Sequence, residues 1–467
     1  MRRLRALWDT LTRPSAAPDG PPASPAEPPA VAQASPAEPS QAAPALPPEE
    51  PPSAPAPPVE PTPPAPGAFS GINPADVIEK FTVEDLSATA ENYFRSIADA
   101  LPQMSKPFSN LLESPQILES MGLLLAGLQL GKTMTVLEFG AGTCWFSRYL
   151  NQLQCRTISC DVSRTALDIG RRLFREFPIV GAPISEPVFL HFDGHKIDLP
   201  DESVDRIVCH DAFHHVPNQE EVISELGRVL KSGGIAGFAE PGRFHSRAPH
   251  SQYEMANYDV LENDIVPADI FAIARKHGFD DMRLKVLCDM EVSVSQSVAL
   301  TDGAADQDLV ELVRQNIGTT MNNRTVFFLY KGRVVPDSRS HLGLGHSISV
   351  GGGSAFQVAT GDELRLSLAI VNTGSARWII ENVHDIGVVK VGTHLYAASG
   401  KLLDLDFSRH YFSRPIEPGE TVSRDIALTF RDPGVYRVAI DLVSEGICWF
   451  ENVGATPQSV TVEVSGA

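Results

Sequence analysis

The residues best suited to chemistry in this chain of 467 residues lie around a Gly-x-Gly turn. The segment TVLEFGAGTCWFSRYL (135–150) predicts an apolar strand, a turn containing Gly140 and Gly142, and then an amphipathic helix. Glycines in such a turn let the backbone approach a ligand without a Cβ in the way. Trp145 stands where a dinucleotide-binding turn needs its third glycine, so the start of this helix does not suit a pyrophosphate.

Two carboxylates complete this candidate ligand site. Glu138 directly precedes the turn, where its charge would repel a pyrophosphate and suit the ammonium and sulfonium groups of S-adenosylmethionine. Asp161 ends the next predicted strand, in TISCDVS, where an acid can accept hydrogen bonds from both hydroxyls of a ribose. The charge of the site therefore predicts a cationic donor molecule.

The chain resembles the class I S-adenosylmethionine-dependent methyltransferases, especially the family related to the ubiquinone and menaquinone biosynthesis enzymes. The resemblance extends from Thr135 to about Lys331, weakens after Gly242, and includes VLEFGAGTCW, CDVS, FDGHKIDLPDESVDRIVCHDAFHHVP and ELGRVLKSGGIAGFAEPG in the family's order. Glu138 departs from the commoner Asp but supplies the same charge.

The resemblance implies S-adenosylmethionine as the cofactor. It places Asp193 and Gly194 at the adenine, and His210 and Asp211 at the methionine end. The cofactor-binding residues expected on this basis and from the turn are Glu138, Gly140, Ala141, Gly142, Asp161, Val162, Asp193, Gly194, His210 and Asp211.

Candidate catalytic residues follow the fourth and fifth predicted strands. An enzyme that transfers a methyl group aligns the acceptor and excludes water, and a hydroxyl acceptor also needs a base. The polar segment 240–264 lies where substrate loops belong, so His245 or His250 is the expected base, with His214 as a further candidate. Solvent-facing histidines are the open alternative. We expect His215 to pack and hydrogen-bond within its loop.

These residues need a scaffold, and strand-like and helix-like segments alternate from Thr135 to about Lys331. This alternation predicts a Rossmann-like domain with a mostly parallel sheet, for which the resemblance implies seven strands. Helical segments at 83–101 and 114–130 are expected to cap the pocket.

Beyond Val334, short alternating segments separated by turns such as NTG, EPGE and DPG predict an antiparallel β-sandwich. This part loosely resembles the Ig-like modules of bacterial polysaccharide-handling proteins. Trp378, Trp449 and Phe450 are candidates for stacking on sugar rings, although core packing is favoured for Trp378.

Changes in composition along the chain predict where its segments and domains begin and end. We expect a basic amphipathic segment at 1–13, a disordered Pro/Ala-rich linker at 14–68, a methyltransferase domain with its helical cap at 69–333, and the sandwich at 347–467. The first of these could dock on a membrane surface or a protein partner, and the alternative is a basic terminus without a role.

Charge and cysteine usage narrow the functional classes. The net charge of -20 argues against nucleic acid as a partner. The six cysteines are scattered without zinc spacing, so no metal is expected and reduced thiols in the cytoplasm are predicted. A peripheral position at the inner membrane is the alternative location.

The predicted function is methyl transfer to a small-molecule or saccharide acceptor, in cell-envelope polysaccharide metabolism. The alternative is a non-catalytic S-adenosylmethionine-binding scaffold, or a glycan-binding component of a polysaccharide assembly machine. Modification of a quinone-like lipid fits the family but gives the sandwich no role.

Overall fold

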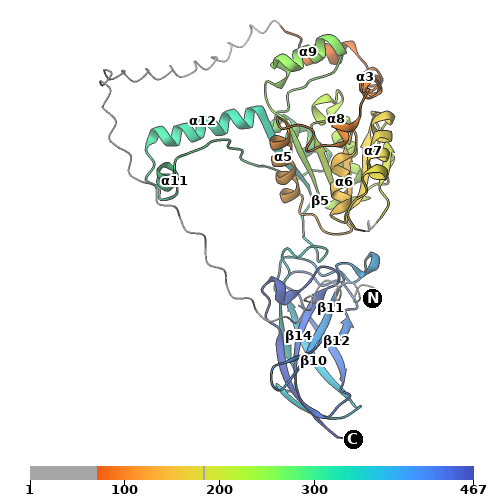
Figure 1. Ribbon diagram of the computed structural model, residues 1–467, viewed down its shortest axis with the longest axis vertical. Helices are drawn as coiled ribbons and strands as arrows, with labels where there is room; N and C mark the ends of the chain where they lie inside the picture. The colour runs from red at the N-terminus through yellow and green to blue at the C-terminus, as the bar shows by residue number, and fades with distance from the viewer. Residues whose placement is uncertain (1–70, 182–184, 467) are drawn as a thin grey trace, which may run out of the picture. The chain divides into compact units, whose positions relative to one another are not determined.

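The computed structural model describes residues 71–181 and 185–466 (Figure 1). The predicted basic segment 1–13 and Pro/Ala-rich linker 14–68 lie outside this range. Within the described ranges, none of the helices combines the length and the apolar character that crossing a membrane requires.

A seven-stranded sheet forms the first half of the described chain, in the order β3-β2-β1-β4-β5-β7-β6. The first five strands pair in parallel, whereas β7 runs antiparallel to both β5 and β6. The mostly parallel seven-stranded sheet predicted from the sequence is thus confirmed. Its strands are β1 (Thr135–Phe139), β2 (Arg156–Asp161), β3 (Val188–His191), β4 (Val204–His210), β5 (Leu230–Pro241), β6 (Asp281–Leu284) and β7 (Arg324–Lys331).

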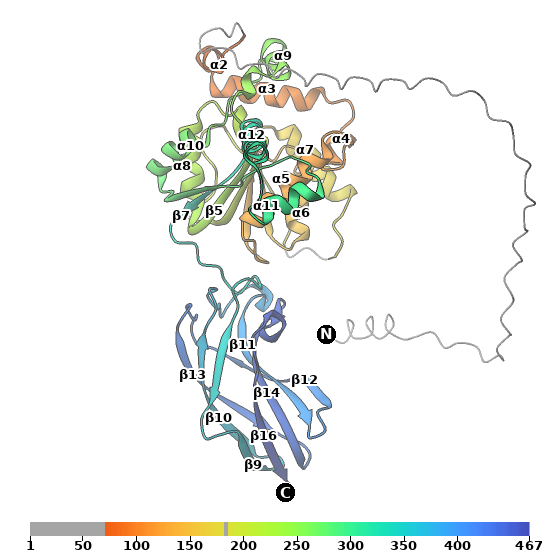
Figure 2. The same cartoon turned by 90° about the vertical axis from the view of Figure 1, so that its left-hand side faces the viewer.

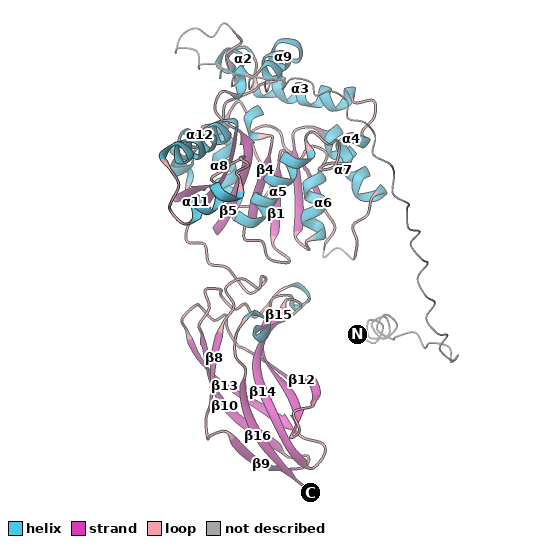
Figure 3. Cartoon of the chain, turned by 60° about the vertical axis from the view of Figure 1, so that its left-hand side comes forward, coloured by secondary structure: helices cyan, strands magenta, loops and turns pink. Residues whose placement is uncertain are grey.

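Helices cover both faces of this sheet (Figure 3). Successive strand residues point to opposite faces, so Leu137 and Phe139 of β1 enter one core while Val136 enters the other. Both faces are buried, which explains why the central strands are almost continuously apolar. The helices are α2 (Pro74–Lys80), α3 (Val83–Ser96), α4 (Leu101–Met104), α5 (Ser114–Gly127), α6 (Trp145–Gln152), α7 (Arg164–Glu176), α8 (Gln219–Val229), α9 (Pro249–Tyr258), α10 (Pro267–Ala274), α11 (Val294–Thr301) and α12 (Gln307–Asn323).

Helix α3 crosses above one end of the sheet, next to α2 and α9 (Figures 2 and 3). Its start is fixed by a capping box, in which Thr82 Oγ1 accepts the Asp85 N–H and the Asp85 carboxylate accepts the Thr82 N–H. Leu86 of α3 packs in a small core with Val77, Met255 and Leu261. Helix α3 therefore forms a roof over this end of the sheet, whereas α5 packs against the sheet in the core that contains Val136.

Two sheets make up the second half of the described chain. One has the order β13-β10-β8 and the other β12-β11-β14-β16-β9, with the short β15 paired to β14. All pairs are antiparallel except β16 with β9. The strands are β8 (His346–Val350), β9 (Ala355–Ala359), β10 (Glu363–Asn372), β11 (Val389–Ala397), β12 (Leu402–Tyr411), β13 (Thr421–Thr429), β14 (Gly434–Ser444), β15 (Cys448–Trp449) and β16 (Gln458–Ser465).

Both sheets contribute to one hydrophobic core, so this part of the chain is a β-sandwich. Trp378 and Phe450 lie in that core with no exposed surface, because large aromatic side chains fill the space between the sheets. The suggestion that Phe450 stacks on a sugar is therefore wrong. Trp449 remains half-buried. The likeness to Ig-like modules and the domain boundaries at 333 and 347 stay predictions.

Candidate functional site

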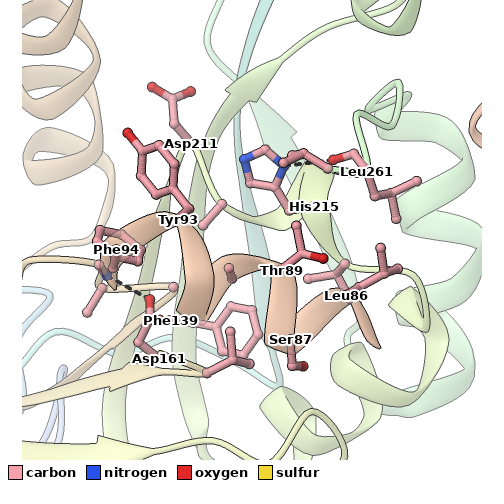
Figure 4. A pocket seen from close by; sticks show the side chains of 18 of the residues that line it. Leu86, Ser87, Thr89, Tyr93, Phe94, Phe139, Asp161, Asp211, His215 and Leu261 are labelled. Atoms are coloured by element: carbon pink, nitrogen blue, oxygen red, sulfur yellow. Dashed lines mark hydrogen bonds between the residues drawn. The ribbon is translucent and has the colours of Figure 1, made fainter. Parts of the chain in front are cut away.

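A pocket of about 440 Å³ lies at the carboxyl ends of the parallel strands (Figure 4). Its floor comes from the residues that follow β1, β2, β3 and β4, and its roof comes from α3. Loops at this edge of a parallel sheet are where α/β proteins bind ligands. The pocket brings together the predicted residues Gly140, Ala141, Gly142, Asp161, Val162, Gly194, His210, Asp211 and His250.

The glycine turn after β1 is shaped for close approach. Gly140 has φ +68°, and a Cβ built on it would lie 2.2 Å from the Cβ of Ala212. Gly142 has φ +50°, in the left-handed region that disfavours other residues. A side chain at either position would strain the turn or fill the pocket floor, as a ligand-binding turn requires.

Asp161 lies at the end of β2 with both carboxylate oxygens on the pocket floor. Oδ2 accepts the Gly142 N–H at 2.7 Å, and Oδ1 accepts the Ser163 N–H at 2.8 Å. Each oxygen keeps a second lone pair for a ligand hydroxyl. Burial raises the pKa of Asp161 to about 6, against the opposing effect of these two N–H groups.

Two of the predicted cofactor contacts, Glu138 and Asp193, are not among the residues that line the pocket. Glu138 Oε2 accepts the Ser147 N–H at 2.7 Å inside the protein, and burial raises the pKa of this carboxyl to about 8. Asp193 Oδ1 accepts the N–H groups of His195 and Lys196, at 2.8 and 2.7 Å. Both acids are thus engaged by the backbone that supports the site.

His210 ends β4, Asp211 follows it, and both line the pocket. Arg324, at the start of β7, donates from Nη1 to Asp211 Oδ1 at 2.6 Å and from Nη2 to Oδ2 at 3.2 Å. Burial opposes ionisation of Asp211, but His210 and Arg324 hold its pKa well below the ordinary value. This bidentate pair, which the sequence did not indicate, keeps Asp211 ionised and fixes the direction of its carboxylate.

The roof is tied to the floor through Glu91 of α3. Its carboxylate accepts from Ser163 Oγ at 2.7 Å, Thr165 Oγ1 at 2.7 Å and Thr165 N at 3.1 Å. Burial opposes ionisation, but these bonds lower the pKa of Glu91 to about 2. The rings of Tyr93 and Phe94, one turn further on, line the pocket (Figure 4).

His215 lines the pocket with 43% of its side chain accessible. Its Nδ1 lies 2.7 Å from the backbone carbonyl oxygen of Leu261, as Figure 4 shows. A carbonyl only accepts, so Nδ1 carries the hydrogen and Nε2 keeps a free lone pair. Burial and the neighbouring His214 lower the pKa of His215 to about 4, so the ring is neutral at pH 7.

Two of the three histidines predicted as candidate bases, His214 and His245, lie behind the pocket wall. His214 Nδ1 is 2.7 Å from Glu240 Oε2, and His245 Nε2 is 2.6 Å from Glu262 Oε2. Neither histidine is among the lining residues. We call the group of His214, His215, His245, Glu240 and Glu262 the pocket cluster.

Glu240 organises the pocket cluster. Its fully buried carboxylate also accepts the N–H groups of Ala212 and Phe213, at 3.2 and 3.0 Å. Burial disfavours both charges, but the pairing raises the pKa of His214 and lowers that of Glu240. A buried ion pair therefore holds the turn that carries His215.

The third candidate base, His250, lines the pocket but leaves 79% of its side chain exposed. Its Nε2 lies 3.7 Å from Glu254 Oε1. Glu254, Asp259 and Glu262 line the same end of the pocket as acidic groups. The position of His250 agrees with a solvent-facing histidine better than with an oriented base.

Residues 137–238 match the protein family described as "Methyltransferase domain". Among curated proteins, a sarcosine/dimethylglycine N-methyltransferase of Halorhodospira halochloris is 32% identical over 114 residues, which cover 24% of this chain and 39% of that protein. A ubiquinone/menaquinone biosynthesis C-methyltransferase of Enterobacter sp. (strain 638) is 26% identical over 121 residues, covering 25% and 46%. This chain thus spans less than half the length of either relative.

Among solved structures, phosphoethanolamine N-methyltransferase 2 of Haemonchus contortus, with S-adenosyl-L-methionine bound, aligns at 14% identity and a TM-score of 0.35. The alignment covers 56% of this chain and 61% of that one.

Proposed function

Residues 137–238 are a methyltransferase domain of the S-adenosylmethionine-dependent kind, and from this premise we propose that the chain methylates a small polar acceptor held beside His215. The observation that carries the proposal is the continuity of the pocket. The glycine turn and Asp161 line one end, and His215 with Glu262 lines the other. One cavity of about 440 Å³ thus joins a candidate donor site to a candidate acceptor site.

The donor end fits S-adenosylmethionine by its chemistry. Asp161 has lone pairs for the two ribose hydroxyls, and the Gly140–Gly142 turn leaves room for the backbone of a bound ligand. Asp211, held ionised by Arg324, has one further lone pair on each oxygen for the ammonium group. When bound, the cofactor supplies an electrophilic methyl group on a positively charged sulfur.

At the acceptor end, we assign His215 Nε2 as the atom that removes the acceptor's proton. The Leu261 carbonyl fixes the tautomer, and Glu240 fixes the turn on which the ring stands. A ring that is neutral at pH 7 can accept a proton. The α3 roof, held by Glu91, keeps water from the reacting atoms.

The acidic lining favours an amine as the acceptor. Glu254, Asp259 and Glu262 attract a protonated amine before it loses its proton, and the ring of Tyr93 offers a face to a cation. A saccharide hydroxyl can donate to the same carboxylates. A role in envelope polysaccharide metabolism rests on this second class and on a glycan held by the sandwich.

Calorimetry with S-adenosylmethionine and S-adenosylhomocysteine tests the donor site. We expect Asp161→Ala to weaken binding at least tenfold and Gly140→Val to abolish it, because these changes remove the ribose acceptor and fill the turn. Asp168→Ala is the matched control, since Asp168 is an exposed acid on α7 paired with Arg171. Equal affinity in all four proteins would refute the donor site.

A radiolabelled methyl-transfer assay tests the acceptor class. Sarcosine, dimethylglycine and other small amines form one arm, and free sugars form the other. Label in an amine supports the proposal, and label in a sugar replaces the amine with a saccharide. Cofactor binding without transfer to either arm or to a cell extract would favour the non-catalytic scaffold.

A further inference from the structure

The β-sandwich contains a second group of histidines and carboxylates, which we call the sandwich cluster: His346, His394, Asp441 and Glu451. His394, on β11, is fully buried. Its Nδ1 lies 2.5 Å from the carbonyl oxygen of Leu405, so Nδ1 carries the hydrogen and Nε2 keeps its lone pair. That Nε2 is buried and has no hydrogen-bond partner. A buried acceptor in this state is costly unless something binds it.

Two carboxylates surround this unpaired nitrogen. Glu451 Oε1 lies 3.6 Å from His394 Nε2, which is too long for a hydrogen bond. One ligand atom each from His394, Asp441 and Glu451 lies within 4.8 Å of the others. Two ligands of one zinc ion, each about 2.1 Å from it, lie up to about 4.2 Å apart. The three side chains are therefore close to the spacing at which they share an ion.

Asp441, on β14, is also fully buried. One oxygen accepts the Glu451 N–H at 3.0 Å, and the other is bonded to His346 Nε2. Among the described residues, His346 is the only basic side chain within ion-pair distance of Asp441. Its own Nδ1 is buried without a hydrogen-bond partner, as is His394 Nε2. The sandwich cluster thus contains two buried ring nitrogens whose hydrogen bonding is unsatisfied.

We propose that His394, Asp441 and Glu451 bind a divalent transition-metal cation, for which Zn²⁺ is the probe. An imidazole nitrogen with two carboxylates suits Zn²⁺ better than Ca²⁺, which takes oxygen ligands. Two positive charges offset the two carboxylates. The Leu405 carbonyl on His394 and the His346 ring on Asp441 are the outer partners that orient metal ligands in proteins.

The ion would fix the segment that carries Trp449. Glu451 belongs to the short 3₁₀ turn Phe450–Val453, which directly follows β15. The Trp449 ring lies 4.0 Å from the His394 ring, and Gly392 makes room for it, because a Cβ there would lie 2.5 Å from Trp449. The Arg409 guanidinium lies 4.2 Å from the centre of the Trp449 ring. Metal binding would therefore hold the one half-exposed tryptophan of the sandwich in place.

The test uses the full chain, purified without an affinity tag that binds metal. Elemental analysis and calorimetry with Zn²⁺, after treatment with a chelator, measure stoichiometry and affinity. We expect one zinc per chain and a thermal midpoint that rises by several degrees when zinc is added. Glu451→Gln keeps the size of the side chain and is expected to weaken zinc binding at least tenfold.

Glu445→Gln is the matched control, because Glu445 is a partly buried acid of the same sheet that pairs with Arg409 and Lys390. It should bind zinc as the unaltered chain does. Absence of zinc binding by the unaltered chain overturns the proposal. Equal affinity in both variants would place the metal elsewhere and would also overturn the proposal. Binding of Ca²⁺ in preference to Zn²⁺ would overturn the role of His394 Nε2 as a ligand. These readouts do not involve methyl transfer, so they are independent of the proposed function.

Discussion

The pocket cluster and the sandwich cluster contain the same chemical groups but differ in how completely these groups are paired. In the pocket cluster, His214 pairs with Glu240, His245 pairs with Glu262, and His215 bonds to a backbone carbonyl. In the sandwich cluster, one ring nitrogen of each histidine is buried without a partner. The hydrogen bonds of the pocket cluster orient the His215 ring toward a ligand. In the sandwich cluster, a bound cation would supply the partner that the protein does not.

Replacing the ring that faces the pocket should have the largest effect. We expect His215→Ala to lower kcat about 10² to 10⁴-fold for a hydroxyl acceptor, because the base is lost, with less effect for an amine. The affinity for S-adenosylmethionine should stay within about twofold. His250→Ala is the matched control and should change kcat little, since its side chain is largely exposed. Steady-state kinetics with the identified acceptor provides the measurement, and equal losses in both variants would contradict the assignment of His215.

Removing the buried charge of Glu240 should have the next largest effect. Glu240→Gln leaves the buried His214 without its nearest counter-charge, so the free energy of unfolding should fall by about 3–5 kcal/mol. Chemical denaturation measures this loss. Glu220→Gln, which removes an exposed ion pair with Lys276, should change it by less than about 1 kcal/mol. A similar small change in Glu240→Gln would show that the pocket cluster is not held by its ion pair.

The pH dependence of donor binding should be smaller. Burial raises the pKa of Asp161 to about 6, so its carboxylate is ionised at pH 7 and becomes protonated as the pH falls through 6. Protonation removes charge and one lone pair from the ribose site. The affinity for S-adenosylmethionine should therefore be constant from pH 7 to 8 and fall about tenfold between pH 7 and 5. In calorimetry across this range, Asp161→Asn should abolish the step, and a step that persists would exclude Asp161 as its cause.

The smallest effect should come from Asp441 when zinc is absent. In a chelator, Asp441→Asn keeps an oxygen for the Glu451 N–H and places its amide beside His346 Nε2. We therefore expect the free energy of unfolding to change by less than about 1 kcal/mol. A loss as large as that of Glu240→Gln would show that the sandwich cluster is a complete ion-pair network, and the contrast between the two clusters would fail.

The sequence revealed the parts of the site that lie close together along the chain. Gly140, Gly142 and Asp161 were predicted because a glycine turn and a strand end place them at one edge of the sheet whatever the rest of the chain does. Glu138, in β1, and Asp193, just after β3, were predicted at the same edge of the sheet. Their carboxylates nevertheless bond to backbone N–H groups of Ser147, His195 and Lys196, which the order of residues does not reveal.

Contacts between distant residues could not be predicted in this way. The acceptor that fixes the tautomer of His215 is Leu261, which is 46 positions away, and only the fold brings the two together. The sandwich cluster is spread from His346 to Glu451 and has no zinc spacing, so a metal could not be predicted from the order of residues. Strand pairing places Gly392 opposite Asp441, and this pairing depends on the whole sheet.

The segment that matches the methyltransferase family covers only part of the pocket. Tyr93 of the roof, and Leu261 and Glu262 at the acceptor end of the pocket, all fall outside the matched segment 137–238. The matched segment thus contains the glycine turn and Asp161 of the donor end, whereas part of the roof and of the acceptor end lies outside it.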